Sequence, residues 1–208
     1  MRARCWSLPV RCGRGADSGF MDSLLPAFVA ILLASATDRS AWLAAILGDR
    51  YASVAGVLTG FVIAQIALAG VAVAGALVLR PMMSDEARHL LSALALLSAG
   101  VGMMLRGKAP DRMERWRLGA VGTSALGGLT LGLGERAQFL IFAFAVAGAY
   151  PVLSGVGGAM GYMVAILPAV VLGEAQWCAL PRRAFGIVAG AVFIVTGAIV
   201  ALSALRLI

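Results

Sequence analysis

The chain has 208 residues, of which 61% are hydrophobic and only 13% are charged, and its mean hydropathy is +0.94. Soluble domains are about 45–50% apolar and about 25% charged, so this composition excludes an ordinary soluble domain. The net charge of +7 does not indicate nucleic-acid binding, because Lys and Arg stand at the ends of apolar runs and form no basic face. The sequence predicts an all-α polytopic membrane protein that lies in a lipid bilayer and binds no nucleic acid.

Residues 1–20 form a basic, polar segment that precedes a second methionine, Met21. No apolar run follows the basic start before residue 20, so the segment lacks the central part of a signal peptide. We expect translation to start at Met21 and residues 1–20 to be an upstream or disordered tail. The alternative is a basic anchor on the cytoplasmic side.

Six apolar runs follow, and about 20 apolar residues are needed to cross a bilayer. The predicted transmembrane helices cover residues 24–47, 52–79, 90–105, 118–147, 152–172 and 184–205. Adjacent charges interrupt two of them: Asp38 and Arg39 the first, Glu135 and Arg136 the fourth. Pro151 separates the fourth helix from the fifth, because proline suits a helix start and not an interior. Most of the 26 glycines are expected to let helices pack closely in lipid.

The loops after the first, third and fifth helices are richer in Lys and Arg than the opposite loops. Counted from Met21, the first set holds eight of these residues and the second set three. The positive-inside rule therefore predicts a cytoplasmic central loop at 106–117 and periplasmic termini, in the inner (plasma) membrane of a bacterium. Including residues 1–20 adds four Arg to the weaker side and nearly removes the difference.

The two charged interruptions occupy the same place in the two halves of the chain. The segment "GVLTGFVIAQIALAGV" (56–71), after the first, corresponds to "GVGGAMGYMVAILPAV" (155–170), after the second. We therefore predict a 3+3 inverted repeat, with repeat one at 21–105, the basic loop at 106–117 and repeat two at 118–208. Three spans per repeat turn the second copy upside down, so both interruptions are expected in one site near the membrane midplane.

The interruptions resemble the signature motifs of the Gdt family, manganese/calcium–proton exchangers of the lysine-exporter superfamily. That family carries Glu-x-Gly-Asp-(Lys/Arg)-(Thr/Ser) in its first and fourth helices; here "SATDRS" (35–40) and "GLGERA" (132–137) stand in those places. The leading glutamate is Ser35 in the first motif and Gly132 in the second, whereas each motif keeps one acid followed by one arginine. The resemblance implies a secondary transporter that exchanges or exports Mn²⁺ or Ca²⁺ against protons.

Hard divalent cations prefer oxygen ligands, and the two motifs offer them. The expected ligands of the transported metal ion are Asp38, Glu135, Ser35, Thr37, Ser40 and Gln138. Arg39 and Arg136 are the charge partners in the site, and they balance the two acids. A bound dication then leaves an excess of positive charge in a medium of low dielectric constant, which is unfavourable.

Two alternatives remain for the function. Two acids and two arginines also suit a zwitterion, so the first alternative is an exporter of amino acids or other small solutes within the same superfamily. The second is a vestigial scaffold without transport, locked by the crossed ion pairs Asp38 with Arg136 and Arg39 with Glu135. Crossed pairs are expected because adjacent residues on a helix do not face each other. No HExxH, GxSxG or P-loop pattern occurs, so the sequence predicts neither an enzyme nor a cofactor site.

Overall fold

The computed structural model describes residues 15–51, 53–105, 110–112, 116 and 118–205, and within these ranges it contains helices and no strand. The elements are α1 (Gly15–Ser35), α2 (Arg39–Tyr51), α3 (Val54–Leu79), the 3-10 helix η1 (Arg80–Met82), α4 (Asp85–Met104), α5 (Gly119–Gly132), α6 (Arg136–Ala147), α7 (Pro151–Ala179) and α8 (Arg182–Ala204). Residues 1–14 of the expected tail and most of the loop 106–117 lie outside the described ranges, and residues 15–20 belong to α1.

Within the described ranges, four helical segments are long and apolar enough to cross a membrane: α3 with η1, α4, α7 and α8. Two further pairs pass the same test together, each with a sharp bend at a short break. Phe20–Ser35 and Arg39–Tyr51 meet at 64°, and Gly119–Gly132 and Arg136–Ala147 meet at 67°. Counting each bent pair as one span gives up to six spans, so the prediction of an all-α polytopic membrane protein is confirmed.

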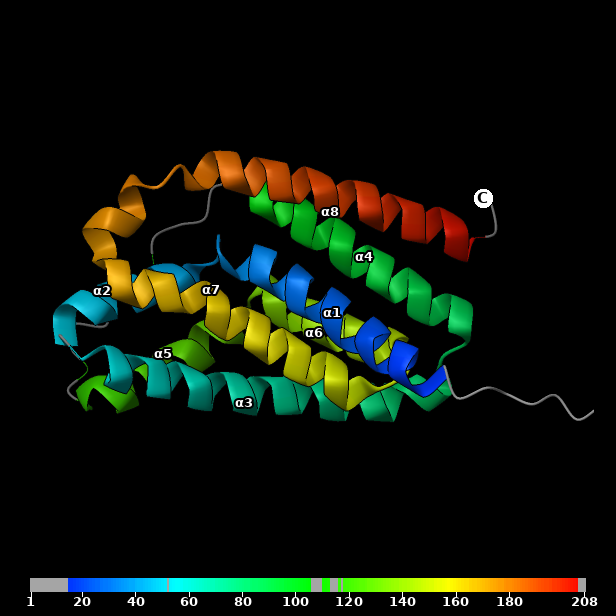
Figure 1. The fold of residues 1–208 in the computed structure, drawn as a ribbon, viewed down its shortest axis with the longest axis horizontal. Helices are drawn as coiled ribbons and strands as arrows, with labels where there is room; N and C mark the ends of the chain where they lie inside the picture. Colours follow the sequence, from blue (N-terminus) through cyan, green and yellow to red (C-terminus); the bar gives the residue numbers. More distant parts are fainter. Residues whose placement is uncertain (1–14, 52, 106–109, 113–115, 117, 206–208) are drawn as a thin grey trace, which may run out of the picture.

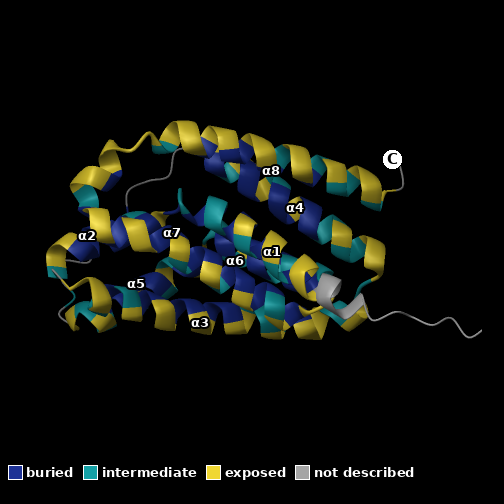
Figure 2. Cartoon of the chain, viewed as in Figure 1, coloured by how far each residue is buried: buried dark blue, intermediate teal, exposed yellow. Residues whose placement is uncertain are grey.

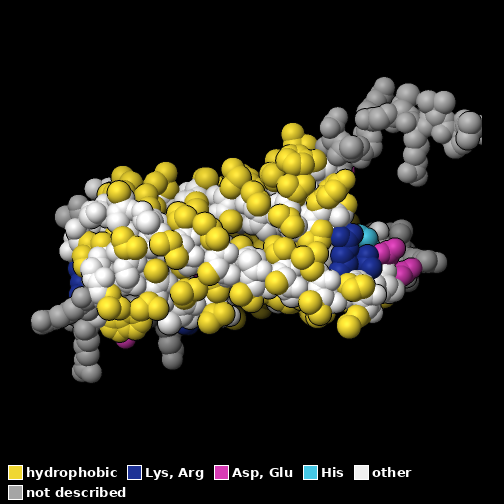
Figure 3. Space-filling model, turned by 90° about the horizontal axis from the view of Figure 1, so that it is seen from below, with side chains coloured by type: hydrophobic (Ala, Val, Ile, Leu, Met, Phe, Trp, Pro, Cys, Tyr) yellow, Lys and Arg dark blue, Asp and Glu magenta, His cyan; other side chains and the backbone are white. Residues whose placement is uncertain are grey.

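The helices run along one long axis, and the two halves of the chain pack on each other reciprocally (Figure 1). The broken span α1–α2 packs on α7 of the second half, the broken span α5–α6 packs on α3 of the first half, and α4 packs on α8. The start of α1 and the end of α8 lie at the same end of the bundle. Buried residues line the inward faces of the helices and exposed residues the outward faces (Figure 2). Hydrophobic side chains cover the middle of the outer face seen in Figure 3, as a lipid-facing surface requires.

Helix boundaries in the second half repeat those in the first at a constant offset. The offset is 97 residues between four pairs of boundaries: Ser35 and Gly132, Arg39 and Arg136, Val54 and Pro151, Asp85 and Arg182. The backbone agrees as well, since Ser53 before α3 has φ −122° and ψ 85°, and Tyr150 before α7 has φ −122° and ψ 91°. The two segments therefore fold locally in the same way although their side chains differ.

Two helix ends differ from the predicted ones for local reasons. Helix α4 begins at Asp85, before the apolar run, because the Ser84 side chain accepts the Ala87 N–H at 3.3 Å and caps the first turn. Helix α7 continues past the predicted end at 172, but Gly173 has φ +72°, so the regular helix stops there. The last turn is then capped from α2, where Asp49 Oδ2 accepts the Glu174 N–H at 2.7 Å.

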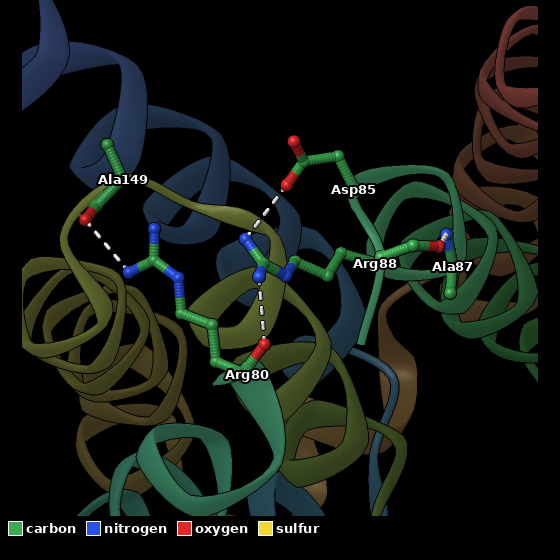
Figure 4. Close-up of polar contacts among 6 residues, drawn as sticks. Arg80, Asp85, Ala87, Arg88 and Ala149 are labelled. Carbon is green, nitrogen blue, oxygen red and sulfur yellow. Dashed lines mark hydrogen bonds and ion pairs between the residues drawn. The ribbon is translucent and has the colours of Figure 1, made fainter. Parts of the chain in front are cut away.

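Charged side chains gather at the end of the bundle where α3 passes into η1 (Figure 3). Arg80 donates to the Ala149 carbonyl at 3.0 Å, and Arg88 donates to Asp85 at 2.9 Å and to the Arg80 carbonyl at 2.8 Å (Figure 4). These bonds tie η1 and α4 of the first half to the turn between α6 and α7 of the second. Arg80 therefore links the two halves, and both arginines contribute to the charge bias of the loops.

Glycines allow the close helix contacts that the sequence predicts. A Cβ atom on Gly60 of α3 would lie 2.5 Å from the Val121 carbonyl oxygen and 2.6 Å from Ser124 Cβ, both on α5. By contrast, a Cβ atom on Gly70 of the same helix would meet nothing within 4 Å. Helix α3 thus contains one glycine that is required for packing and one that is not.

We expect Gly60→Ala to lower the thermal unfolding midpoint (Tm) of the detergent-solubilised protein. Overpacking of this kind costs about 1–3 kcal/mol, because the neighbouring backbone must move. The matched variant Gly70→Ala should leave the Tm unchanged or raise it, since alanine is the better helix former. Equal midpoints for the two variants would contradict the α3–α5 packing described above.

Candidate functional site

Both broken spans break in the same way. At the first break the N–H groups of Thr37 and Asp38 bond three residues back, to Ala34 at 3.3 Å and Ser35 at 3.1 Å. At the second break, the Gly134 and Glu135 N–H groups bond to the carbonyls of residues 131 and 132, at 3.1 Å and 3.2 Å. These tight turns leave the first N–H groups of α2 and α6 without helical partners. Discontinuous helices of this kind supply polar backbone groups to sites in membrane proteins.

Asp38 is buried between α1 and α2, with a relative exposure of 4%. Its Oδ1 atom accepts from Arg136 Nε at 2.9 Å and also from Arg136 Nη2, so an ion pair joins the two breaks. Arg136 is the first residue of α6 and comes from the other half of the chain. The crossed pair that the sequence predicts between these two residues is therefore present.

Glu135 precedes α6 but makes no capping bond to its own helix. Instead, its Oε1 atom accepts the backbone N–H of Ser40, in the first turn of α2, at 2.7 Å. A carboxylate at a helix N-terminus is stabilised by the free N–H groups and by the helix dipole. The acid of one break is thus held by the helix start of the other break.

The second crossed pair predicted from the sequence, Arg39 with Glu135, does not form. Arg39 is exposed, and among the described residues it makes no ion pair. Arg39 lines the cavity described next, as Asp38 does, but makes no ion pair there with the described acids. The site is therefore asymmetric: one arginine is inserted and the other is not.

A cavity of about 500 Å³ lies beside the two breaks. Its lining comes from both breaks and from the end of α4, and it comprises Thr37, Asp38, Arg39, Gly102, Met103, Leu105, Thr130, Leu131, Gly134, Glu135 and Arg136. Both acids and both arginines of the motifs thus line one space. The prediction that the interruptions meet is in agreement with this cavity.

Of the neutral residues of the predicted ligand set, Thr37 lines the cavity with the two acids and Ser40 bonds to Glu135, whereas Ser35 and Gln138 are not part of the cavity lining. Ser35 and Ser40 are fully buried, Thr37 donates from its hydroxyl to the Ala34 carbonyl at 3.2 Å, and Gln138 donates to Gln65 at 2.9 Å. Five buried side-chain oxygens have no hydrogen-bond partner among the described residues: Ser35 Oγ, Asp38 Oδ2, Ser40 Oγ, Glu135 Oε2 and Gln138 Oε1. Buried polar atoms are normally satisfied, so a group of unpartnered oxygens indicates a place for a positively charged ligand.

Two further residues belong to this region and were missed by sequence reasoning. Gln65 of α3 is 1% exposed and bonds to Gln138, and Tyr162 of α7 is 2% exposed and interacts electrostatically with Glu135 and Asp38. They are 97 residues apart, the same offset that relates the helix boundaries. The sequence does show one signal: Gln65 is a single glutamine in a long apolar helix without charged residues. Polar groups inside a membrane usually have a functional role.

The site offers carboxylate, hydroxyl and amide oxygens, and Met103 is the one sulfur-containing side chain in the described cavity lining. Among the described residues, no group of three or more His, Cys, Asp or Glu side chains lies close enough to hold a metal ion. An ion here would be bound by two carboxylates and completed by neutral oxygens, which suits hard cations such as Ca²⁺ and Mn²⁺ and does not suit Zn²⁺ or copper. Two carboxylates also suit a weakly held cargo better than a permanent metal.

The fold and this site define a polytopic α-helical membrane protein with a polar site between two broken spans. Residues 23–111 match the family model described as divalent cation/proton antiporter GDT1. The match covers less than half of the chain, from within α1 through α4, and it supports the resemblance to the Gdt family found in the sequence. The family is one of transporters, in agreement with the expectation that the chain is not an enzyme. Neither a curated protein nor a solved structure matches the chain.

We expect Asp38→Asn and Arg136→Gln each to lower the Tm markedly, because removing one partner of a buried ion pair costs about 3–5 kcal/mol. The double variant should lose less than the sum of the two single losses, since neither charge is then left alone. Thermal unfolding in detergent measures this cycle. Arg39→Gln, an exposed arginine in the same site, is the control and should leave the Tm unchanged; strictly additive losses would show that the pair is not formed in the membrane protein.

Proposed function

We propose that the protein is a secondary transporter of the bacterial inner membrane that exchanges Mn²⁺ or Ca²⁺ for protons. The observation that carries the proposal is a group of five side-chain oxygens between the broken spans, buried and without a hydrogen-bond partner among the described residues, two of which belong to Asp38 and Glu135. The family described as divalent cation/proton antiporter supports the type of cargo. Asp38 and Glu135 would bind the cation, and Ser35, Thr37, Ser40 and Gln138 would complete its coordination.

We propose further that the two halves, 21–105 and 118–208, form an inverted repeat that rocks around this site. The constant offset of the helix boundaries, the bends of 64° and 67°, and the reciprocal packing of each broken span on the other half support this relation. Transporters with inverted repeats place cargo between the repeats, on discontinuous helices, and move one repeat against the other. Alternating access would then expose Asp38 and Glu135 to each side of the membrane in turn.

The orientation is proposed from the charges at the two ends of the bundle. Arg50, Arg112, Arg182 and Arg183 lie at or beyond helix ends on the side of the α7–α8 connection, and this side would face the cytoplasm. Both termini would then be periplasmic. Arg182 lies over the Trp42 ring at 4.7 Å, an arrangement typical of interfacial tryptophans at the headgroup level.

A zwitterionic solute, such as an amino acid, is the second candidate cargo. A cavity of about 500 Å³ is far larger than one ion and lies in the usual range for small-molecule sites. It presents an exposed guanidinium, Arg39, and a carboxylate without an ion-pair partner among the described residues, Glu135. These two groups could receive the carboxylate and the ammonium group of one solute.

We expect proteoliposomes that contain the protein to move protons when an Mn²⁺ or Ca²⁺ gradient is applied, as followed with a pH-sensitive dye inside the vesicles. Asp38→Asn and Glu135→Gln should each lower this cation-dependent proton flux at least tenfold, because each removes one of the two negative charges that bind the cation. Asp85→Asn is the matched control: this exposed acid at the far end of α4 should leave the flux unchanged.

The same vesicles separate the candidate functions. Unchanged flux in the double variant Asp38→Asn/Glu135→Gln would show that the cation does not use this site. Uptake of labelled amino acids without any response to Mn²⁺ or Ca²⁺ would favour the zwitterion. No flux with either cargo, in protein that unfolds cooperatively, would favour the scaffold.

A further inference from the structure

Arg136 forms an ion pair with Asp38, which is one of the two acids assigned to the cation. Both of its contacts, from Nε at 2.9 Å and from Nη2, go to Oδ1 and leave Oδ2 without a partner. The third guanidinium nitrogen, Nη1, is buried, and it also has no hydrogen-bond partner in the part of the chain that the structure describes. The guanidinium is therefore held along one edge only, by a single oxygen atom.

The charge of the buried groups decides whether Arg136 can stay when a dication binds. With Arg136 in place, Asp38 and Glu135 have only one negative charge in excess, which balances one further positive charge. Without Arg136, the charge of the two acids equals that of a dication, and the exposed Arg39 remains as the other arginine of the cavity. Because an uncompensated charge is strongly unfavourable away from water, the stable complex with a dication is the one from which the guanidinium has withdrawn.

The surroundings of Arg136 provide room for that withdrawal. Its side chain lines the cavity of about 500 Å³, into which the exposed Arg39 also projects. Its stem passes Gly102 of α4, where a Cβ atom would lie 2.8 Å from Arg136 Cδ. The glycine leaves space for the arginine stem, and the cavity that the side chain lines adjoins the guanidinium.

We propose that Arg136 is a tethered counter-cation, which neutralises Asp38 while the site is without cargo and is displaced into the cavity by the transported divalent cation. The inference rests on the proposed function, because it assigns a role within the same site. It makes Arg136 a residue that determines specificity: the site balances a monovalent cation when Arg136 stays and a divalent cation when it leaves. It also explains how a chain without the two motif glutamates can still neutralise a dication.

Equilibrium binding of Mn²⁺ to the purified protein in detergent tests the displacement. We expect Arg136→Gln to bind Mn²⁺ at least tenfold more tightly than the unchanged protein, because the cation no longer competes with the guanidinium. Arg183→Gln removes the same charge from an exposed position outside the cavity and should change the dissociation constant less than twofold. Binding by Arg136→Gln that is equal to or weaker than that of the unchanged protein would overturn the inference.

A second measurement uses the unchanged protein, in case Arg136→Gln does not fold. Phenylglyoxal modifies accessible guanidinium groups, and mass spectrometry of the digested protein gives the rate for each arginine. We expect Mn²⁺ to raise the rate at Arg136 severalfold and to leave the rate at Arg183 unchanged. A rate at Arg136 that stays constant or falls on addition of Mn²⁺ would refute the displacement.

These results also separate the inference from the function on which it rests. Mn²⁺ binding that is lost in Asp38→Asn and Glu135→Gln but does not respond to Arg136→Gln would support the cation site and overturn the role of Arg136. Absence of Mn²⁺ and Ca²⁺ binding in all of these folded variants would overturn both.

Discussion

The desolvation of two carboxylates inside a bundle of apolar helices is the constraint on which the rest of the structure depends. An ionised side chain is expensive in the membrane interior unless it is paired or hydrogen-bonded. Two spans of this chain are broken, and each break frees backbone N–H groups at the start of the helix that follows it, α2 or α6. Glu135 accepts one of these groups, from Ser40. Asp38 instead forms a hydrogen-bonded ion pair with the Arg136 guanidinium. Each acid is thus held by the opposite break, so these contacts join the two halves of the chain.

The two breaks have the same backbone geometry but unequal side chains, and this inequality gives the site its chemistry. Four pairs of helix boundaries share one offset, yet Gly132 stands opposite Ser35, and Tyr162 stands opposite Gln65. Two identical motifs would place like charges at symmetric positions, where they repel. Here one acid forms an ion pair with an arginine, while the other accepts the backbone N–H of Ser40. The asymmetry leaves one carboxylate without an ion-pair partner among the described residues, at the edge of a cavity that also exposes Arg39.

Much of the architecture could be predicted because hydrophobicity and charge act over whole segments. The six apolar runs, the two interruptions and their meeting in one cavity follow from segment length and from the repeated order of motifs. Which of the two crossed ion pairs forms could not be predicted. The sequence treats Arg39 and Arg136 alike, and only the direction of each side chain at its helix start shows that Arg136 enters the site while Arg39 does not. Gln65 and Tyr162 were missed because a buried polar residue in an apolar helix is recognised by its neighbours in space, not along the chain.

The replacement of the two motif glutamates changes the balance of the site without removing its oxygens. Ser35 is fully buried and its hydroxyl oxygen has no partner, so it can still act as a ligand where a glutamate stands in the family motif. What is lost is negative charge, and with it the capacity to neutralise a dication beside two arginines. Arg39 already lies outside the buried part of the site. The positive charge that remains beside the acids is therefore that of the Arg136 guanidinium. In the proposal above, the position of this group between Asp38 and the cavity determines which cations the site can hold.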